Sequence, residues 1–311
     1  MSTPQSTPQS TSQSTSRGYL TTEQANPNSE NLDRLSTIAI VDLFNQEDHR
    51  TIEAIAGARD DLAEAIDRIT AALRSGGRLF YIGAGTSGRL GVLDASECPP
   101  TFCTPPEMVQ GIIAGGAAAL VKSSEGLEDS SEGGAKAVDE YGMTAADVLV
   151  GIAAGGTTPY VHGAIAEARK RGAVAIFMAC VPKDQVRIEV DVDIRLPVGP
   201  EILAGSTRLK SGTVTKMALN ILSTGAMVRL GKVYGNRMID VAVTNIKLHD
   251  RALRILMDLT SLSREASDAL LTQSGQSVKL ALAMHWTGQD LDSCDRLLLE
   301  HGGNLRSAIE A

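Results

Sequence analysis

The segment Leu79-Phe-Tyr-Ile-Gly-Ala-Gly-Thr-Ser-Gly88 indicates which class of fold this chain adopts. It opens with a short apolar run typical of a buried strand, passes through a glycine-rich turn, and leads into another apolar stretch that we interpret as a helix. Backbone N–H groups of such a turn and the positive end of the helix point at one spot, which suits a phosphate. The predicted phosphate contacts are Gly83, Gly85, Thr86, Ser87 and Gly88.

The same glycines have the spacing Gly-x-Gly-x-x-Gly of dinucleotide-binding folds. An acidic residue is missing at the end of the next apolar run, Val109–Ile113, which continues into Ala114-Gly115-Gly116. Thr86 and Ser87 add hydroxyl donors, which favour a phosphomonoester over a pyrophosphate lying against bare backbone. A tight turn that binds nothing is the alternative interpretation.

Four more short apolar runs follow, with helix-like segments between most of them. These runs are Val109–Ile113, Val148–Ile152, Val174–Ala179 and Val192–Leu196. Alternation of this kind predicts a doubly wound α/β fold with a mostly parallel sheet of about five strands and helices on both faces. Helical spacing over Leu35–Phe44 and Ile52–Leu73 predicts two leading helices ahead of the sheet.

A long, mostly apolar helix is predicted over Ser211–Leu230. It is too apolar all round to lie on a monomer surface with one face in water, so we expect it at the centre of the domain or at a subunit interface. The second alternative predicts a homodimer.

The polar cluster Gly205 to Thr213 stands at the start of this helix and predicts a second anion contact. Ser206, Thr207 and Lys210 offer hydroxyls and a cation to an anion at the helix N-terminus. A plain capping segment is the alternative. Loops at the carboxyl ends of strands meet in a doubly wound sheet, so we expect both loops to converge on one sugar phosphate.

The two ends of the chain differ in composition from the middle. Residues 1–30 are rich in Ser, Thr, Pro and Gln, and we expect a disordered tail because few apolar side chains offset the ordering entropy. Residues 31–248 form the predicted main domain. Beyond it the pattern changes to short amphipathic helices, one of them capped by Ser263, so residues 249–311 are predicted to form a small three-helix domain.

Composition excludes several function classes. The net charge of −8 argues against a nucleic-acid partner, and no apolar run is long enough for a membrane helix. Four cysteines without metal-ligand spacing fit reduced thiols, and the chain starts without an apolar signal segment, so we expect a cytoplasmic protein. The five histidines lack paired metal spacing, so no metal and no cofactor are expected.

Four motifs of this chain resemble the N-acetylmuramic acid 6-phosphate etherases, and the resemblance runs from about Asn31 to the C-terminus. The motifs are Gly83 to Thr101, Glu125 to Gly134, Gly205 to Thr213 and Gly231 to Asn245. The resemblance implies an SIS domain of the flavodoxin-like type, a small C-terminal domain similar to ubiquitin-associated folds, and a homodimer. It also implies removal of D-lactate from N-acetylmuramic acid 6-phosphate with water added, leaving N-acetylglucosamine 6-phosphate, in cell-wall amino-sugar recycling or catabolism.

The resemblance places the proton donor of this carbon–oxygen lyase on Glu97 and its second acid/base glutamate on Glu128. Choosing Glu128 over Glu125 rests on the motif alone, and capping of a helix start is the alternative role for this acidic segment. One loop departs from the family pattern. Where many relatives have Ser and Arg, this chain has Gly155 and Thr157, which puts substrate contacts on that loop in doubt.

Two carboxyl groups suit the implied chemistry. Opening the sugar ring exposes an aldehyde at C1 that acidifies the C2 proton, so a base removes that proton and an acid protonates the departing lactate oxygen, after which water adds at C3. An aldose–ketose isomerase and a non-catalytic sugar-phosphate sensor are the competing functions. The first would not need two separated glutamates in this motif. A non-catalytic sensor would resemble two of these sugar-phosphate domains in tandem, and this chain has room for only one.

Overall fold

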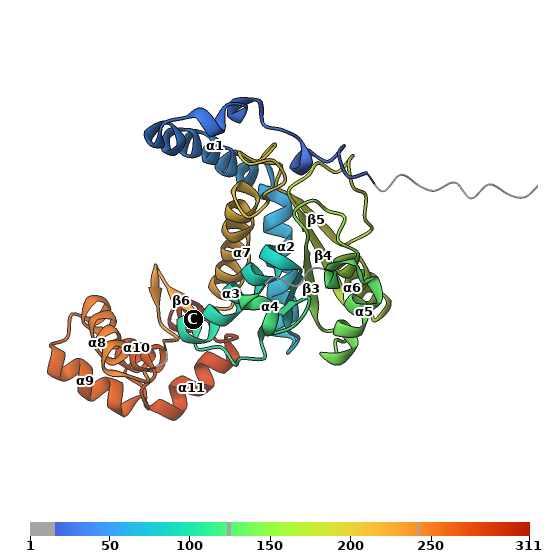
Figure 1. Cartoon of the computed structure of the whole chain (residues 1–311). Helices are drawn as coiled ribbons and strands as arrows, with labels where there is room; N and C mark the ends of the chain where they lie inside the picture. The colour runs from blue at the N-terminus through green and yellow to red at the C-terminus, as the bar shows by residue number, and fades with distance from the viewer. Residues whose placement is uncertain (1–15, 123–125, 242) are drawn as a thin grey trace, which may run out of the picture.

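The computed structural model describes residues 16–122, 126–241 and 243–311, and its centre is a sheet of five parallel strands (Figure 1). The strands lie in the order β2-β1-β3-β4-β5, and every neighbouring pair is parallel. Their bounds are Leu79–Gly83 for β1, Val109–Ile113 for β2, Val148–Ile152 for β3, Val174–Ala179 for β4 and Val192–Arg195 for β5. The predicted doubly wound α/β fold is confirmed.

Alternate side chains of the strands fill two separate cores, because successive residues point to opposite faces of a sheet. Leu79 and Tyr81 of β1 belong to the core under helices α2 (Arg59–Arg74), α3 (Gly85–Phe102) and α7 (Lys210–Arg229). Phe80 and Ile82 belong to the core under α5 (Ser131–Glu140) and α6 (Pro159–Lys170). Burial on both faces explains why β1, β3 and β4 carry no charged residue.

The long helix α7 is central within a single chain. It packs against α1 (Thr37–Gly57), α2 and α3, and eleven of its residues are buried. Only a narrow stripe that includes Lys216, Thr224 and Val228 is exposed. The apolar character of this helix is therefore explained inside one subunit, and the sequence argument that used it to predict a homodimer loses its basis.

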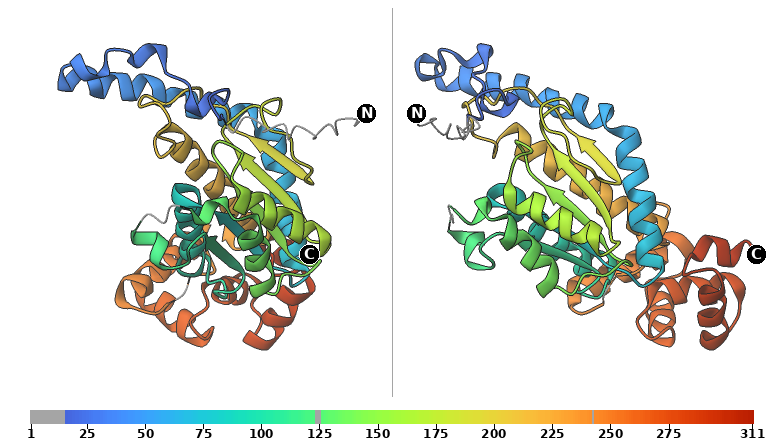
Figure 2. Two further views of the ribbon diagram at one scale, coloured as in Figure 1. Left: turned by 45° about the vertical axis from the view of Figure 1, so that its right-hand side comes forward. Right: turned by 90° about the vertical axis from the view of Figure 1, so that its right-hand side faces the viewer.

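The first leading helix is longer than predicted, the second is shorter, and the two lie closer together along the chain. Helix α1 spans Thr37–Gly57 and α2 follows after a single residue, so the polar segment 45–51 is helical as well. Ser36 caps α1 by accepting a hydrogen bond from Ala39 N. The first half of α1 projects away from the sheet (Figures 1 and 2).

The prediction of disorder over residues 1–30 is wrong for residues 16–30, and residues 1–15 lie outside the described part. Three short 3-10 helices, at Thr21–Glu23, Pro27–Ser29 and Leu32–Arg34, lead into α1. Leu20 is buried against the main domain, and Asn26 donates hydrogen bonds to Glu47 Oε2 and to the carbonyl of Pro200. Few apolar residues suffice here because the segment packs on a surface that the rest of the chain provides.

The C-terminal part contains more helices than the three predicted. The described residues form a short hairpin of β6 (Val233–Tyr234) and β7 (Arg237–Met238), then five helices: α8 (Ile246–Thr260), α9 (Arg264–Gln273), α10 (Val278–Thr287), α11 (Leu291–Glu300) and α12 (Leu305–Ile309). Each of the five helices starts at a side chain that caps it: Asn245, Ser263, Ser277, Asp290 and Asn304. The predicted boundary at residue 248 is too late, because the core of this part begins at Ile239 and α8 at Ile246.

The C-terminal helices lie at the opposite end of the molecule from the projecting half of α1 (Figure 2). No helix among the residues described here is long and apolar enough to cross a membrane.

Candidate functional site

A cavity of about 240 Å³ opens where the loops after β1 and β3 lie side by side. These strands are neighbours, and the chain connections turn in opposite directions at this point of the sheet, which is where ligands bind in open α/β folds. The cavity is lined by Arg17, Leu20, Glu23, Ala84, Gly85, Thr86, Ser87, Glu128, Ala154, Gly155, Thr157, Thr158 and Thr207. Hydroxyls and backbone from three separate loops thus face one small space.

The glycine-rich turn divides into residues that face the cavity and residues that shape the turn. Gly85 begins α3 with a φ of 52°, a conformation that glycine adopts without strain, and it lines the cavity together with Thr86 and Ser87. Gly83 and Gly88 do not line it. A Cβ on Gly88 would stand 2.6 Å from the carbonyl oxygen of Gly83, so these two glycines allow the first turn of α3 to lie against β1. The prediction that Gly83 and Gly88 contact the ligand is therefore replaced by a structural role.

The N-terminus of α7 already holds an anion from its own chain. The buried carboxylate of Glu201 accepts hydrogen bonds from Lys210 N at 3.0 Å and Ser211 N at 2.9 Å. The side chain of Lys210 is fully buried and donates to Glu47 of α1. The structure contradicts the prediction that Lys210 contacts the substrate, because its charge is used in this internal ion pair.

Only one of the two predicted hydroxyl residues in the same loop lines the cavity. Thr207 lines it, whereas Ser206 does not. Ser206 instead donates its backbone N–H to the carbonyl of Leu203, and its own carbonyl accepts from Leu209 N. Of the three residues predicted in this cluster, the structure brings one to the site.

Glu47 and Glu201 are two carboxylates whose importance the sequence analysis missed. Burial would raise the pKa of Glu47, but hydrogen bonds from Lys210, Asn28 and Asn26 outweigh it and lower the pKa to about 2. Both glutamates are nearly inaccessible to solvent and hold the start of α7 in place. No sequence signal marks them, because Glu47 pairs with Lys210 at a separation of 163 positions and Glu201 binds backbone N–H groups, which nearly every residue carries.

Glu128 stands at the wall of the cavity, on the 3-10 helix Leu127–Asp129. Its side chain is exposed, and the neighbouring Asp129 carboxylate lies 3.8 Å from the Arg17 guanidinium. Glu128 therefore lines the same cavity as the glycine-rich turn. Glu125, the alternative choice, lies outside the described residues.

Glu97 lies far from this cavity in the same chain. Twelve residues separate it from Gly85 along α3, which is about 18 Å along the helix axis at about 1.5 Å per residue. Glu97 lines a different cavity of about 260 Å³, together with Asp94, Lys216 and Asn220. Within one chain the structure does not bring the two predicted glutamates together.

A buried carboxyl group accompanies Glu97 in its cavity. Burial raises the pKa of Asp94, although its Oδ1 accepts hydrogen bonds from Asn220 Nδ2 at 2.7 Å and from Ser223 Oγ at 3.2 Å. These bonds tie α3 to α7 directly below Glu97. The backbone that carries Glu97 is therefore firmly held.

Residues 17–23 and the loop after β3 were not among the predicted site residues, yet both line the cavity. Arg17, Leu20 and Glu23 come from the segment predicted to be disordered. Gly155 and Thr157 of the loop after β3 also line it. A Cβ on Gly155 would stand 3.3 Å from Thr22 Oγ1, so the small residue makes room for the N-terminal segment.

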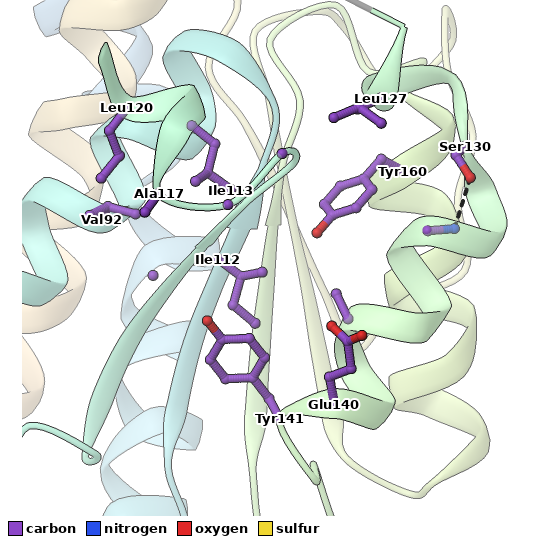
Figure 3. A pocket seen from close by; sticks show the side chains of 15 residues that line it. Val92, Ile112, Ile113, Ala117, Leu120, Leu127, Ser130, Glu140, Tyr141 and Tyr160 are labelled. Carbon is purple, nitrogen blue, oxygen red and sulfur yellow. Dashed lines mark hydrogen bonds between the residues drawn. The ribbon is translucent and has the colours of Figure 1, made fainter. Parts of the chain in front are cut away.

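A larger cavity, about 540 Å³, is not the site of the predicted residues (Figure 3). It lies along the edge strand β2 and is lined mainly by apolar side chains and backbone, with Leu120 and Leu127 on opposite sides. Tyr141, Tyr160 and Glu140 supply its polar side-chain atoms together with Ser130, which is occupied in capping α5. Among the described residues no cation lines this cavity, which makes it a poor match for a phosphate.

Metal chemistry has no candidate in the part of the chain that the structure describes. Over residues 16–122, 126–241 and 243–311, no group of three or more His, Cys, Asp or Glu side chains is placed to hold a metal ion. The expectation that the chain needs no metal stays a prediction.

Family models match two parts of the chain. Residues 61–169 match the glucokinase regulatory protein N-terminal SIS domain, and residues 235–290 match the C-terminal lid domain of glucokinase regulatory protein. Among solved structures, phosphoheptose isomerase from Neisseria gonorrhoeae is similar with a TM-score of 0.46 and 19% identity, covering 60% of this chain and 96% of that chain.

Curated relatives match almost the whole chain. The N-acetylmuramic acid 6-phosphate etherase of Nostoc punctiforme is 69% identical over 293 residues, which cover 94% of this chain and 95% of the relative. The etherase of Synechocystis is 68% identical over 295 residues, covering 95% and 97%. Identity at this level over nearly full length shows that the chain belongs to the N-acetylmuramic acid 6-phosphate etherase family.

Proposed function

We propose that this chain cleaves the D-lactyl ether of N-acetylmuramic acid 6-phosphate with water, giving N-acetylglucosamine 6-phosphate and D-lactate. The observation that carries the proposal is the near full-length identity to etherases named for this substrate. The cavity at the start of α3 supports it, because it combines an open helix N-terminus with hydroxyl side chains and a carboxylate. The reaction belongs to cell-wall amino-sugar recycling or catabolism.

The 6-phosphate binds at the first turn of α3. The side chains of Thr86 and Ser87 line the cavity there, and the N-terminal backbone N–H groups of a helix favour a phosphate electrostatically. Thr207 adds a hydroxyl from the loop before α7. With the phosphate in this place, the sugar extends across the cavity towards Glu128.

Glu128 acts as the base of an elimination. Its exposed carboxylate lies at the cavity wall and takes the C2 proton of the ring-opened sugar, which the C1 aldehyde acidifies. An acid then protonates the ether oxygen as lactate leaves, and water adds to the unsaturated sugar at C3. We assign the acid role to Glu97.

A second copy of the chain supplies Glu97 in this proposal, since Glu97 is about 18 Å along α3 from the phosphate turn of its own chain. Glu97 is exposed, and Leu93, one turn earlier on α3, is an exposed apolar side chain suited to an interface. A homodimer would then form two sites, each with the phosphate turn and Glu128 of one copy and Glu97 of the other.

The reaction itself is tested by incubating the protein with N-acetylmuramic acid 6-phosphate in heavy-oxygen water. D-lactate should appear, and the label should be at C3 of the sugar product. Label in the lactate hydroxyl would exclude elimination. An aldose–ketose isomerase or a non-catalytic sensor would release no lactate.

Mixing two variants tests the shared site. Glu97→Gln and Glu128→Gln should each be nearly inactive, since acid or base catalysis contributes about 10²–10⁴-fold. Mixed and refolded together, they should recover about a quarter of wild-type activity, because half of random dimers are mixed and one of the two sites in each mixed dimer is intact. If both glutamates act within one copy, mixing restores nothing. Sedimentation at micromolar concentration should show twice the chain mass.

We also propose a cytoplasmic location. All four cysteines, Cys98, Cys103, Cys180 and Cys294, are unpaired in the structure, which fits a reducing compartment.

A further inference from the structure

Arg17 brings the only basic side chain to the cavity, as far as the described residues go. The other charged groups of the lining are the carboxylates of Glu23 and Glu128. The proposed substrate carries two anionic groups, the 6-phosphate and the carboxylate of its lactyl group. Because two carboxylates already make the cavity negative, binding the second anionic group of the substrate needs a compensating cation.

The segment that carries Arg17, residues 17–23, forms a strap that is fixed to the main domain. The side chain of Leu20 is buried, and Leu20 N donates to the carbonyl of Arg17 at 3.0 Å. Thr21 donates its backbone N–H to Gln185 Oε1 at 3.0 Å, and its hydroxyl accepts from Gln185 Nε2 at 2.8 Å. The strap therefore holds the backbone of Arg17 in place, and Arg17 forms part of the cavity lining.

The guanidinium of Arg17 is held only loosely by its own chain. Within the described part of the chain its acidic partner is Asp129 at 3.8 Å, and both side chains are more than half exposed. Exposed pairs at this separation contribute little and exchange readily for a better partner. A ligand carboxylate, which matches the planar fork of an arginine with two parallel hydrogen bonds, is such a partner.

The contact with Asp129 also fixes the end of the cavity at which the charge lies. Asp129 follows Glu128 directly, so Arg17 stands beside the proposed base. In the proposed reaction Glu128 faces C2, and the lactyl ether is attached to the adjacent carbon, C3. The lactyl carboxylate then falls beside Arg17, whereas the 6-phosphate lies at the other end of the sugar.

We propose that Arg17 is a specificity-determining residue that binds the lactyl carboxylate of the substrate. This inference rests on the proposed function and adds to it the group that distinguishes the substrate from its own product. N-acetylglucosamine 6-phosphate has the phosphate and the sugar but lacks the lactyl group. Loss of Arg17 should therefore weaken recognition of the substrate and leave recognition of the product unchanged.

The test compares substrate turnover with product inhibition in Arg17→Ala, Arg17→Lys and a control, Arg187→Ala. Arg187 is an exposed arginine near Gln185 that does not line the cavity. Arg17→Ala should lower kcat/KM for N-acetylmuramic acid 6-phosphate by at least about tenfold, as for a lost hydrogen bond to a charged group. Its inhibition constant for N-acetylglucosamine 6-phosphate should change less than about twofold, within the energy of one lost weak contact. Arg17→Lys should recover part of kcat/KM, and Arg187→Ala should resemble the wild type.

Two outcomes would overturn the proposal. An equal loss for substrate and product would mean that Arg17 binds the phosphate, and unchanged kcat/KM in Arg17→Ala would mean that it binds neither group. Failure of the proposed function looks different, because the wild-type protein would then release no D-lactate while still binding N-acetylglucosamine 6-phosphate.

Discussion

The N-termini of α3 and α7 follow similar sequences but have different surroundings. Each helix begins after a loop rich in glycine and hydroxyl side chains, and each sequence predicts an anion contact. At α3 the first turn faces an open cavity through Gly85, Thr86 and Ser87. At α7 the corresponding place is filled by the buried carboxylate of Glu201. A helix N-terminus can bind an external anion only where the fold leaves it open.

The difference extends to the charged residue that accompanies each helix start. Lys210 points away from the cavity and pairs with Glu47, which also accepts hydrogen bonds from Asn26 and Asn28. This network joins α1, α7 and the N-terminal segment. We therefore expect substitutions at the start of α7 to change stability, and substitutions at the start of α3 to change activity.

The largest effect is expected for Lys210→Met. It removes the buried cation that donates to the Glu47 carboxylate and leaves that carboxylate with the half-exposed Arg50, whose Nε lies 3.7 Å away. Breaking a buried ion pair in this way typically costs about 3–5 kcal/mol of the free energy of unfolding. Urea unfolding followed by circular dichroism measures this loss. Adding Glu47→Gln to the variant removes the buried carboxylate charge and should restore part of the stability. A Lys210→Met protein that is as stable as the wild type but does not bind substrate would mean that Lys210 is a substrate contact after all.

The same ion pair predicts how stability depends on pH. Because the pKa of Glu47 is about 2 in the folded chain and about 4.5 when unfolded, its contribution is complete above pH 4.5 and is lost as the pH falls towards 2. The shift corresponds to about 3 kcal/mol. Unfolding of the wild type and of the Lys210→Met/Glu47→Gln double variant should be compared between pH 5 and 2, in steps of about half a unit. Parallel curves for the two proteins would contradict the assignment.

Glu201→Gln should have a smaller effect on stability. The carboxamide accepts a hydrogen bond through only one of its two terminal atoms, so one of Lys210 N and Ser211 N loses its partner, at a cost of about 1–3 kcal/mol. The midpoint of denaturant unfolding reports the change. If an added phosphate restored the stability of this variant, the start of α7 would be a latent anion site after all, and the contrast with α3 would be one of occupancy alone.

The smallest effect on stability is expected at the start of α3. Ser87→Ala removes one hydroxyl from the cavity wall and should change the free energy of unfolding by no more than about 0.5 kcal/mol. Its kcat/KM should fall about fivefold, the equivalent of one hydrogen bond. Measuring both quantities on the same preparation distinguishes an effect on activity, expected at the start of α3, from an effect on stability, expected at the start of α7. A stability loss without an activity loss would reverse the comparison.

The sequence by itself determined the five strands and the glycine-rich turn after β1. Both are local properties: an apolar run between glycines forms a buried strand, and a glycine is required where Gly85 adopts a positive φ and where Gly88 contacts β1. The motif around Glu128 also identified a residue that lines the cavity. These features need no information about distant parts of the chain.

Only the tertiary structure decided which charges are free. The sequence predicted Lys210 as a ligand contact, whereas in the structure it pairs with Glu47, 163 positions earlier in the chain. The strap that carries Arg17 looked disordered because its own apolar content is low, yet Gln185 and a surface of the main domain hold it. The length of α3 separates Glu97 from the cavity, although Glu97 and the cavity-lining turn belong to one sequence motif. Burial and ion pairing depend on which distant segments meet, and this information is absent from local sequence patterns.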